Sequence, residues 1–106
     1  MAKYLFTSAY TVEGRRGLLA DGGSGRVEAT RRTAESVGGS LEAMYYSFGE
    51  HDVYIICDLP DNEAAAAVSL AVGASGALDT TTVVLLTPAE IDRAARQAVD
   101  FRAPGA

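Results

Sequence analysis

The chain has 106 residues, 48% hydrophobic and 22% charged, which is the composition of one ordinary globular domain. Its formal net charge of −5 argues against nucleic acid and anionic membrane surfaces as partners, because both attract basic proteins. The single cysteine cannot form an intramolecular disulfide, the start shows no basic leader with a long apolar run, and no charge-free stretch is long enough to cross a membrane. We therefore expect a cytoplasmic protein.

The first third of the chain predicts a strand followed by an interrupted helix. Residues 3–11 are rich in aromatic and β-favouring types and predict the strand. A short helical turn near 12–20 and a longer helix near 24–37 are expected next, separated by a pair of glycines. Ser24 is the expected N-cap of the longer helix, and the pair Gly38 and Gly39 is expected to stop it.

The middle of the chain predicts an antiparallel hairpin. Residues 40–48 and 52–59 read as strands, and the short Gly-Glu-His-Asp turn joins them. The second of these strands is apolar on both of its faces, whereas a strand with one face in water should alternate apolar and polar residues. This pattern predicts that both faces of the strand are covered.

The last part of the chain predicts two helices around one more strand. Asp61 is the expected N-cap of a helix over 62–76. The β-branched run 77–87 predicts the strand, and a threonine–proline–glutamate capping pattern opens a helix over 88–99. The residues from 99 to 106 are a C-terminal tail.

These elements predict an α+β fold in one domain over residues 1–106. The order β-α-β-β-α-β is the ferredoxin-like arrangement, here with an extra C-terminal helix. It packs two helices on one face of a four-stranded antiparallel sheet and leaves the other face bare. The helix 64–76 carries no charge, and a helix that is apolar all round is usually buried all round. We therefore expect a homodimer in which the bare sheet faces pack together.

Three stretches in this order resemble the GYD domain family, over about residues 3–102. They are "GRRGLLADGGSGR", "GGSLEAMYYSFGEHDVYIICDLPDNEAAAAVSLAVGASGA" and "TTTVVLLTPAEID". The resemblance implies the dimeric α/β-barrel version of the ferredoxin-like fold, and it implies no established activity. Gly49 and Asp52 match the glycine and aspartate of the turn that gives the family its name. His51 stands where the family usually has tyrosine.

His51 and Tyr54 are the candidate catalytic residues. A histidine in a turn is a possible general base that titrates near neutral pH. However, neighbouring strand residues point to opposite faces, so Asp52 is badly placed to orient His51. The alternative role of His51 is that of a hairpin residue that hydrogen-bonds the turn. No metal site is predicted, because no ligand spacing occurs and Cys57 reads as a buried structural cysteine.

Two sequence features predict a ligand site. The stretch "DGGSGR" (21–26) precedes a helix start, whose backbone amides could hold an anion beside an arginine; the alternative is a flexible break that redirects the helix. Tyrosines on the strands could line a ligand cavity or fill a dimer interface. The candidate ligand-binding residues are Tyr45, Tyr46, Tyr54, Arg26, Gly23 and Ser24.

Two functions remain open from the sequence. The first is a non-catalytic small-molecule-binding or assembly module that acts as a homo-oligomer. The alternative is a cofactor-free small enzyme of the isomerase or monooxygenase type, which uses His51 or a tyrosine of the cavity. The absence of a paired acid and base, of an activated nucleophile and of a metal-ligand spacing favours the first. No cofactor is expected for either function.

Overall fold

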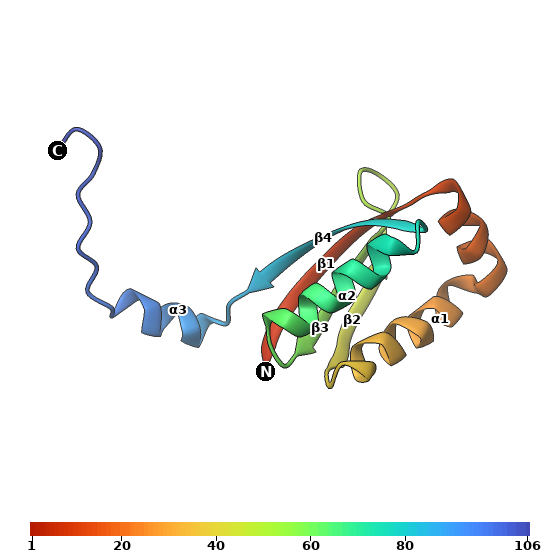
Figure 1. The fold of residues 1–106 in the computed structure, drawn as a ribbon, viewed down its shortest axis with the longest axis horizontal. Helices are drawn as coiled ribbons and strands as arrows, with labels where there is room; N and C mark the ends of the chain where they lie inside the picture. The colour runs from red at the N-terminus through yellow and green to blue at the C-terminus, as the bar shows by residue number, and fades with distance from the viewer.

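The computed structural model describes all residues from 1 to 106 and contains seven helices and strands (Figure 1). In chain order they are β1 (Ala2–Tyr10), α1 (Val12–Ser36), β2 (Ser40–Tyr46), β3 (Val53–Leu59), α2 (Asn62–Ala74), β4 (Leu78–Leu85) and α3 (Pro88–Ala95).

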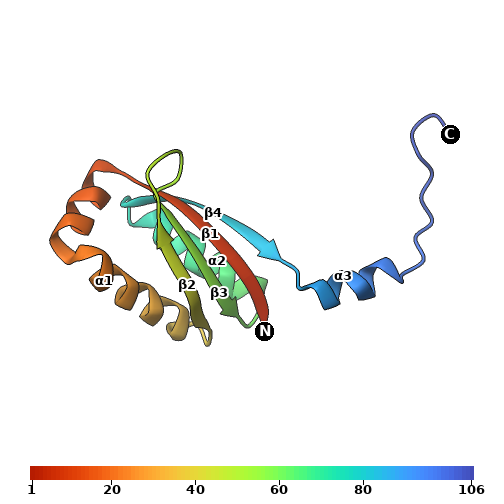
Figure 2. The ribbon, with the colours of Figure 1, turned by 180° about the vertical axis from the view of Figure 1, so that it is seen from behind.

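The four strands form one antiparallel sheet in the order β2-β3-β1-β4. Helices α1 and α2 lie on one face of this sheet, and the view from behind shows that no helix covers the other face (Figure 2). The ferredoxin-like α+β prediction, including the extra C-terminal helix, is therefore confirmed. None of the helices is both long enough and apolar enough to cross a membrane.

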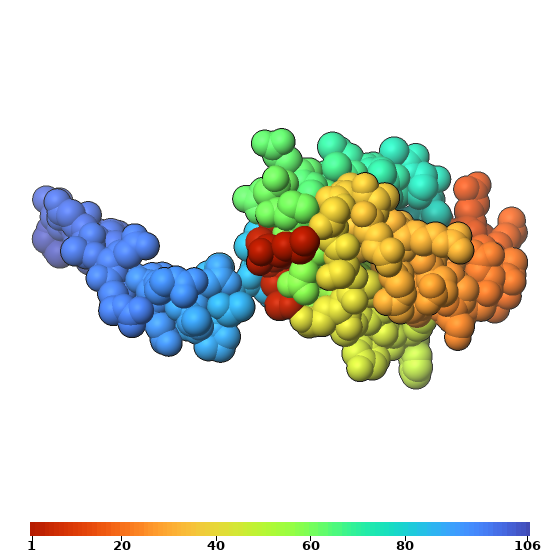
Figure 3. Space-filling view, turned by 90° about the horizontal axis from the view of Figure 1, so that it is seen from below, coloured from red at the N-terminus to blue at the C-terminus, as the bar shows by residue number.

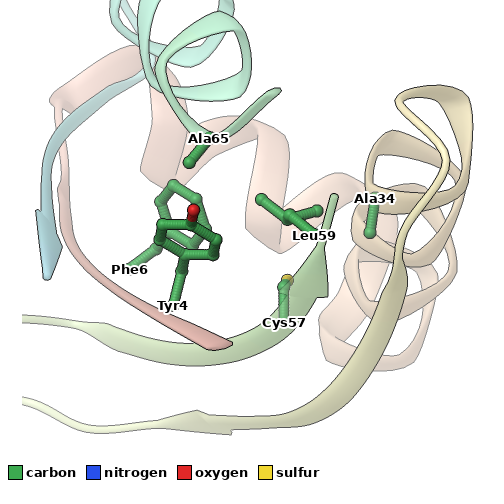
Figure 4. Close-up of a cluster of buried hydrophobic side chains, with 6 residues drawn as sticks. All are labelled: Tyr4, Phe6, Ala34, Cys57, Leu59 and Ala65. Carbon is green, nitrogen blue, oxygen red and sulfur yellow. The ribbon is translucent and has the colours of Figure 1, made fainter. Parts of the chain in front are cut away.

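The strand register determines which side chains meet the helices. Tyr4 of β1 pairs with Cys57 of β3, and Phe6 pairs with Ile55, so these residues share the helix-covered face. A cluster of buried side chains forms the core between the sheet and the two helices (Figure 4). Its members are Tyr4, Phe6, Ala34, Cys57, Leu59 and Ala65.

Helix α1 contains a sharp bend at Gly22. Thr11 caps the start of the helix by accepting a hydrogen bond from the Gly14 amide. Gly22 has φ 77° and ψ 161°, a conformation that residues with a Cβ rarely adopt, and helical residues lie on both sides of it. The two predicted helical segments are confirmed, but the expected N-cap at Ser24 is wrong. The second segment follows the bend directly, so Ser24 lies inside the helix.

The other predicted caps are confirmed, and several predicted ends are wrong by a few residues. Asp61 accepts a hydrogen bond from Ala64 to cap α2, and Thr87 and Glu90 form the capping box of α3. The strands predicted to reach residues 48 and 87 end at 46 and 85, and the helices predicted to reach 76 and 99 end at 74 and 95. The chain turns after α2 at Gly76, whose φ of 74° ends the helical conformation.

Helix α2, which carries no charge after Glu63, is not buried all round within the single chain. Of its residues only Ala65 is buried, and Leu70 on its outer side is 74% exposed. This differs from the expectation for an apolar helix, because one sheet face can cover only one side of it.

Helix α3 and the C-terminal tail extend away from the rest of the protein (Figure 1, Figure 3). Every residue from 91 to 106 is exposed. The radius of gyration is 16.8 Å, whereas a compact domain of this length has about 13 Å. The part of the chain that packs together therefore ends with β4.

Candidate functional site

A cavity of about 70 Å³ lies between the sheet and the helices α1 and α2. Eleven of its sixteen lining residues are hydrophobic. The sheet contributes Phe6, Ser8, Tyr10, Met44, Val53, Ile55, Cys57, Leu59, Leu78 and Thr80, and the helices contribute Arg26, Thr30, Thr33, Ala34, Val68 and Val72.

The inward face of α1 explains why this space is not filled. Arg26, Thr30, Thr33 and Ala34 follow the spacing of one helix face and all line the cavity. A core-facing helix normally carries Leu, Ile or Val at such positions, which would close the gap. Here the two threonines are short and Ala34 is shorter still, so α1 covers the sheet without filling the space beneath it.

The hydroxyl groups of this wall already have partners. Thr30 donates a hydrogen bond to the Arg26 carbonyl at 2.8 Å, and Thr33 donates to the Ala29 carbonyl at 3.0 Å. On the sheet, Ser8 donates to Thr80 at 2.9 Å. Some of the lining residues are polar, but their hydroxyl groups already have partners. A ligand in the cavity would therefore meet a largely apolar wall.

Arg26 is the only charged residue that lines the cavity. The closest carboxylate is that of Asp21, with 3.8 Å between Nη1 of the arginine and Oδ2 of the aspartate. This distance is longer than a hydrogen bond, and both side chains are partly exposed, at 32% and 54%. The guanidinium thus lies at an apolar cavity with one weak ionic contact.

An open groove of about 540 Å³ adjoins the cavity at the bend of α1, and Tyr10 lines both. Across this groove the Tyr46 hydroxyl donates a hydrogen bond to the Gly23 carbonyl at 3.0 Å, which ties β2 to the bend. Burial raises the pKa of the Tyr46 phenol, and the neighbouring Tyr10 adds to this, while Arg26 acts in the opposite direction. The structure therefore brings Gly23, Arg26 and Tyr46 to one place.

Asp52 fixes the β2–β3 loop to the sheet. Its carboxylate accepts a hydrogen bond from the Tyr10 amide at 2.9 Å, and its own amide donates to the Ser8 carbonyl at 2.8 Å. Arg15 of α1 lies 3.9 Å from the same carboxylate. These contacts give Asp52 a structural role at the edge of the groove, where it does not orient His51.

The two candidate catalytic residues lie away from the cavity. Tyr54 pairs with Thr7 on the bare face of the sheet, and the His51 ring packs edge-on against the Tyr54 ring with 6.0 Å between centroids. Tyr45 pairs with Tyr54 and lies on the same face, 73% exposed. The predicted ligand-binding residues are thus divided between two faces of the sheet, and Ser24 is exposed at the bend.

The bare face carries an apolar surface with a charged cluster at one end. Leu5 pairs with Ile56 on one side and with Val83 on the other, so the three side chains form a row across the middle of the sheet. At the end of the face, Lys3 binds Asp58 at 2.9 Å and also binds Glu42. The hydrogen bond to Glu42, followed by that to Asp58, raises the pKa of the Lys3 ammonium group.

Cys57 is buried in the core and lines one wall of the cavity. Burial, with a smaller effect of the Asp58 charge, raises the pKa of its thiol to about 11. A thiol with this pKa stays protonated at neutral pH and is a poor nucleophile. No group of three or more His, Cys, Asp or Glu side chains lies close enough together to hold a metal ion.

Several residues of the cavity were not predicted from the sequence. Met44 and Leu41 lie on the same sheet face although their separation of three would put them on opposite faces, because a β-bulge between Leu41 and Ala43 shifts the register. The signal that could have identified the wall is the spacing of Arg26, Thr30 and Thr33 on one side of α1.

Comparison with known protein families gives one match. The family model of the GYD domain matches residues 4–95, which include all seven helices and strands apart from the first two residues of β1. No curated protein matches the chain. The matched range contains the cavity, the groove and the β2–β3 loop. The chain belongs to the GYD domain family.

Proposed function

We propose that this protein is a non-catalytic binding module that holds a small, largely apolar molecule in the cavity between its sheet and helices and acts as a homodimer. The observation that carries the proposal is the cavity itself, with eleven hydrophobic residues among the sixteen that line it. Ligand sites are typically apolar hollows with a few polar groups, and this cavity has that composition.

The chemistry of the lining favours binding over catalysis. The Ser8 hydroxyl donates to Thr80 and no base lies beside it, and the raised pKa of Cys57 keeps its thiol protonated. His51 lies on the other side of the sheet, against Tyr54. The cavity therefore has no activated nucleophile and no general base of the kinds that enzymes use.

The bare sheet face supports the proposed homodimer. The single chain buries only 11 of its 106 residues, and it leaves Tyr45, Tyr54 and Val83 of this face exposed at 73%, 39% and 41%. Tyrosines and aliphatic residues on one surface are typical of the core of a protein interface. Packing this face against its copy would cover the apolar surface of both subunits at once.

The two methionines of the chain allow a direct test of ligand binding. The Met44 side chain lines the cavity, whereas Met1 is 80% exposed at the N-terminus. We expect titration with 1-butanol, which is small enough for this cavity, to shift the methyl NMR signal of Met44 in a saturable way and to leave that of Met1 unchanged. Equal, unsaturable shifts of both signals would contradict the proposal.

A variant that fills the cavity provides the matching control. Thr33→Leu adds volume to the α1 wall, so we expect butanol binding to be lost while the protein stays folded, because the added side chain occupies the cavity. Ser36→Leu makes a similar change three residues later at an exposed position and should bind butanol like the wild type. Binding that survives Thr33→Leu would place the ligand elsewhere.

A further inference from the structure

We infer that the ligand of this cavity is a carboxylate with a short apolar chain, and that Arg26 binds the carboxylate while the chain lies among the hydrophobic residues. The inference rests on the proposed binding function and specifies its ligand class. It is carried by the position of one arginine on the wall of an otherwise uncharged cavity.

The state of the Arg26 side chain is the first argument. A guanidinium has five N–H donors arranged to grip a carboxylate with two parallel hydrogen bonds. Asp21, at 3.8 Å, is too distant for a hydrogen bond, and no other acidic side chain lies within ion-pair distance. Arg26 is therefore able to bind an incoming anion without first breaking a strong contact.

The uncharged remainder of the lining is the second argument. The hydroxyls of Thr30 and Thr33 donate to carbonyls of their own helix, so neither is left for a ligand to satisfy. Most of the lining residues, such as Phe6, Val68 and Val72, are hydrophobic. A ligand that matches this lining has one charged end and an apolar remainder.

The open groove at the bend of α1 is the third argument. It adjoins the cavity at Tyr10, and the side chain of Arg26 is 32% exposed. A carboxylate at Arg26 would thus keep contact with water while its chain enters the closed space, which avoids the large cost of burying a charge completely. Arg15 lines the groove but not the cavity, so it is not placed to hold a carboxylate whose chain lies in the cavity.

The net charge of the protein does not favour the binding of an anion. The chain carries −5, so its overall field repels anions, and a preference for a carboxylate must come from a local group. We expect butyrate to bind wild-type protein about tenfold more tightly than 1-butanol, the ratio that a charge-assisted hydrogen bond provides. The saturable shift of the Met44 methyl signal measures both affinities.

Substitution of Arg26 separates the ligand class from binding itself. Arg26→Gln should lose the tenfold preference and bind butyrate and 1-butanol with similar affinity, and this remaining binding also shows that the variant is folded. Arg32→Gln removes the same charge from an exposed position of the same helix and should keep the preference.

Each other outcome has a distinct meaning. If 1-butanol binds and butyrate binds no better in wild-type protein, the carboxylate assignment is wrong and the binding function stands. If Arg32→Gln lowers the preference as much as Arg26→Gln, the effect is one of overall charge and the assignment is likewise wrong. If neither compound shifts Met44, both the assignment and the proposed function fail.

Discussion

Gly22 is the residue that sets the direction of α1. Its φ of 77° with ψ of 161° lies in a region that only glycine adopts easily, and a Cβ there would meet no neighbouring atom. Substitution of Gly22 is therefore disfavoured by the backbone conformation alone, and not by a steric clash. The bend brings Gly23 to Tyr46 and forms one side of the groove. The backbone conformation of one residue, Gly22, therefore shapes the site.

Gly22→Ala should destabilise the protein by about 1–3 kcal/mol, the range measured for residues held in such conformations. Gly17→Ala is the matched control, since Gly17 is an exposed residue of the same helix with ordinary dihedral angles and open space around it. It should stabilise the protein by about 0.5–1 kcal/mol, because alanine favours the helix. Urea unfolding measures both changes, and equal effects would show that the bend is not strained.

The β2–β3 loop is held by one side chain rather than by its own turn. The Asp52 carboxylate accepts a hydrogen bond from the backbone amide of the buried Tyr10, so this contact joins the loop to β1. Asp52→Ala would leave that amide unpaired, and we expect a loss of about 1–3 kcal/mol of stability. Asp52→Asn keeps an oxygen acceptor in the same place and should lose clearly less. An equal loss in both variants would point to the Arg15 contact as the main stabilising one.

Local elements were the part of this structure that sequence patterns could predict. The caps at Thr11, Asp61 and Thr87 depend on residues three or so positions apart, so the sequence contains the whole interaction. Side-chain alternation likewise separates Tyr45 from Tyr46, which lie on opposite faces of the sheet. Alternation alone therefore predicts that these two tyrosines belong to different surfaces.

The cavity was beyond prediction for a physical reason. Its size depends on how far α1 stands from the sheet, which follows from the bend at Gly22 and from packing between distant segments. The β-bulge at Leu41 and Ala43 also changes which residues of β2 face inward, and no local pattern marks it. Arg26 was selected from the sequence for its place in the glycine-rich stretch, whereas the structure places it on the wall of the cavity.

At the scale of the whole molecule, the bare sheet face governs association. We expect wild-type protein to sediment as a dimer, because the bare face carries a row of apolar side chains and, beside it, the exposed Tyr54. Tyr54→Glu would place a charge on this face and should shift the protein towards the monomer in analytical ultracentrifugation. Leu19→Glu, at a position of α1 that is 85% exposed and distant from this face, should leave the dimer intact. A wild-type protein that stays monomeric at every concentration would contradict the proposed interface.

The short and polar inner side of α1 also has a consequence for engineering. Arg26, Thr30 and Thr33 occupy positions where larger aliphatic residues would bring more contact between helix and sheet. A screen that selects only for resistance to heat should therefore enrich substitutions at these positions first, and each would consume the space that a ligand needs. In the selected library, substitutions at these three positions would then show that a tighter fold and an open site conflict.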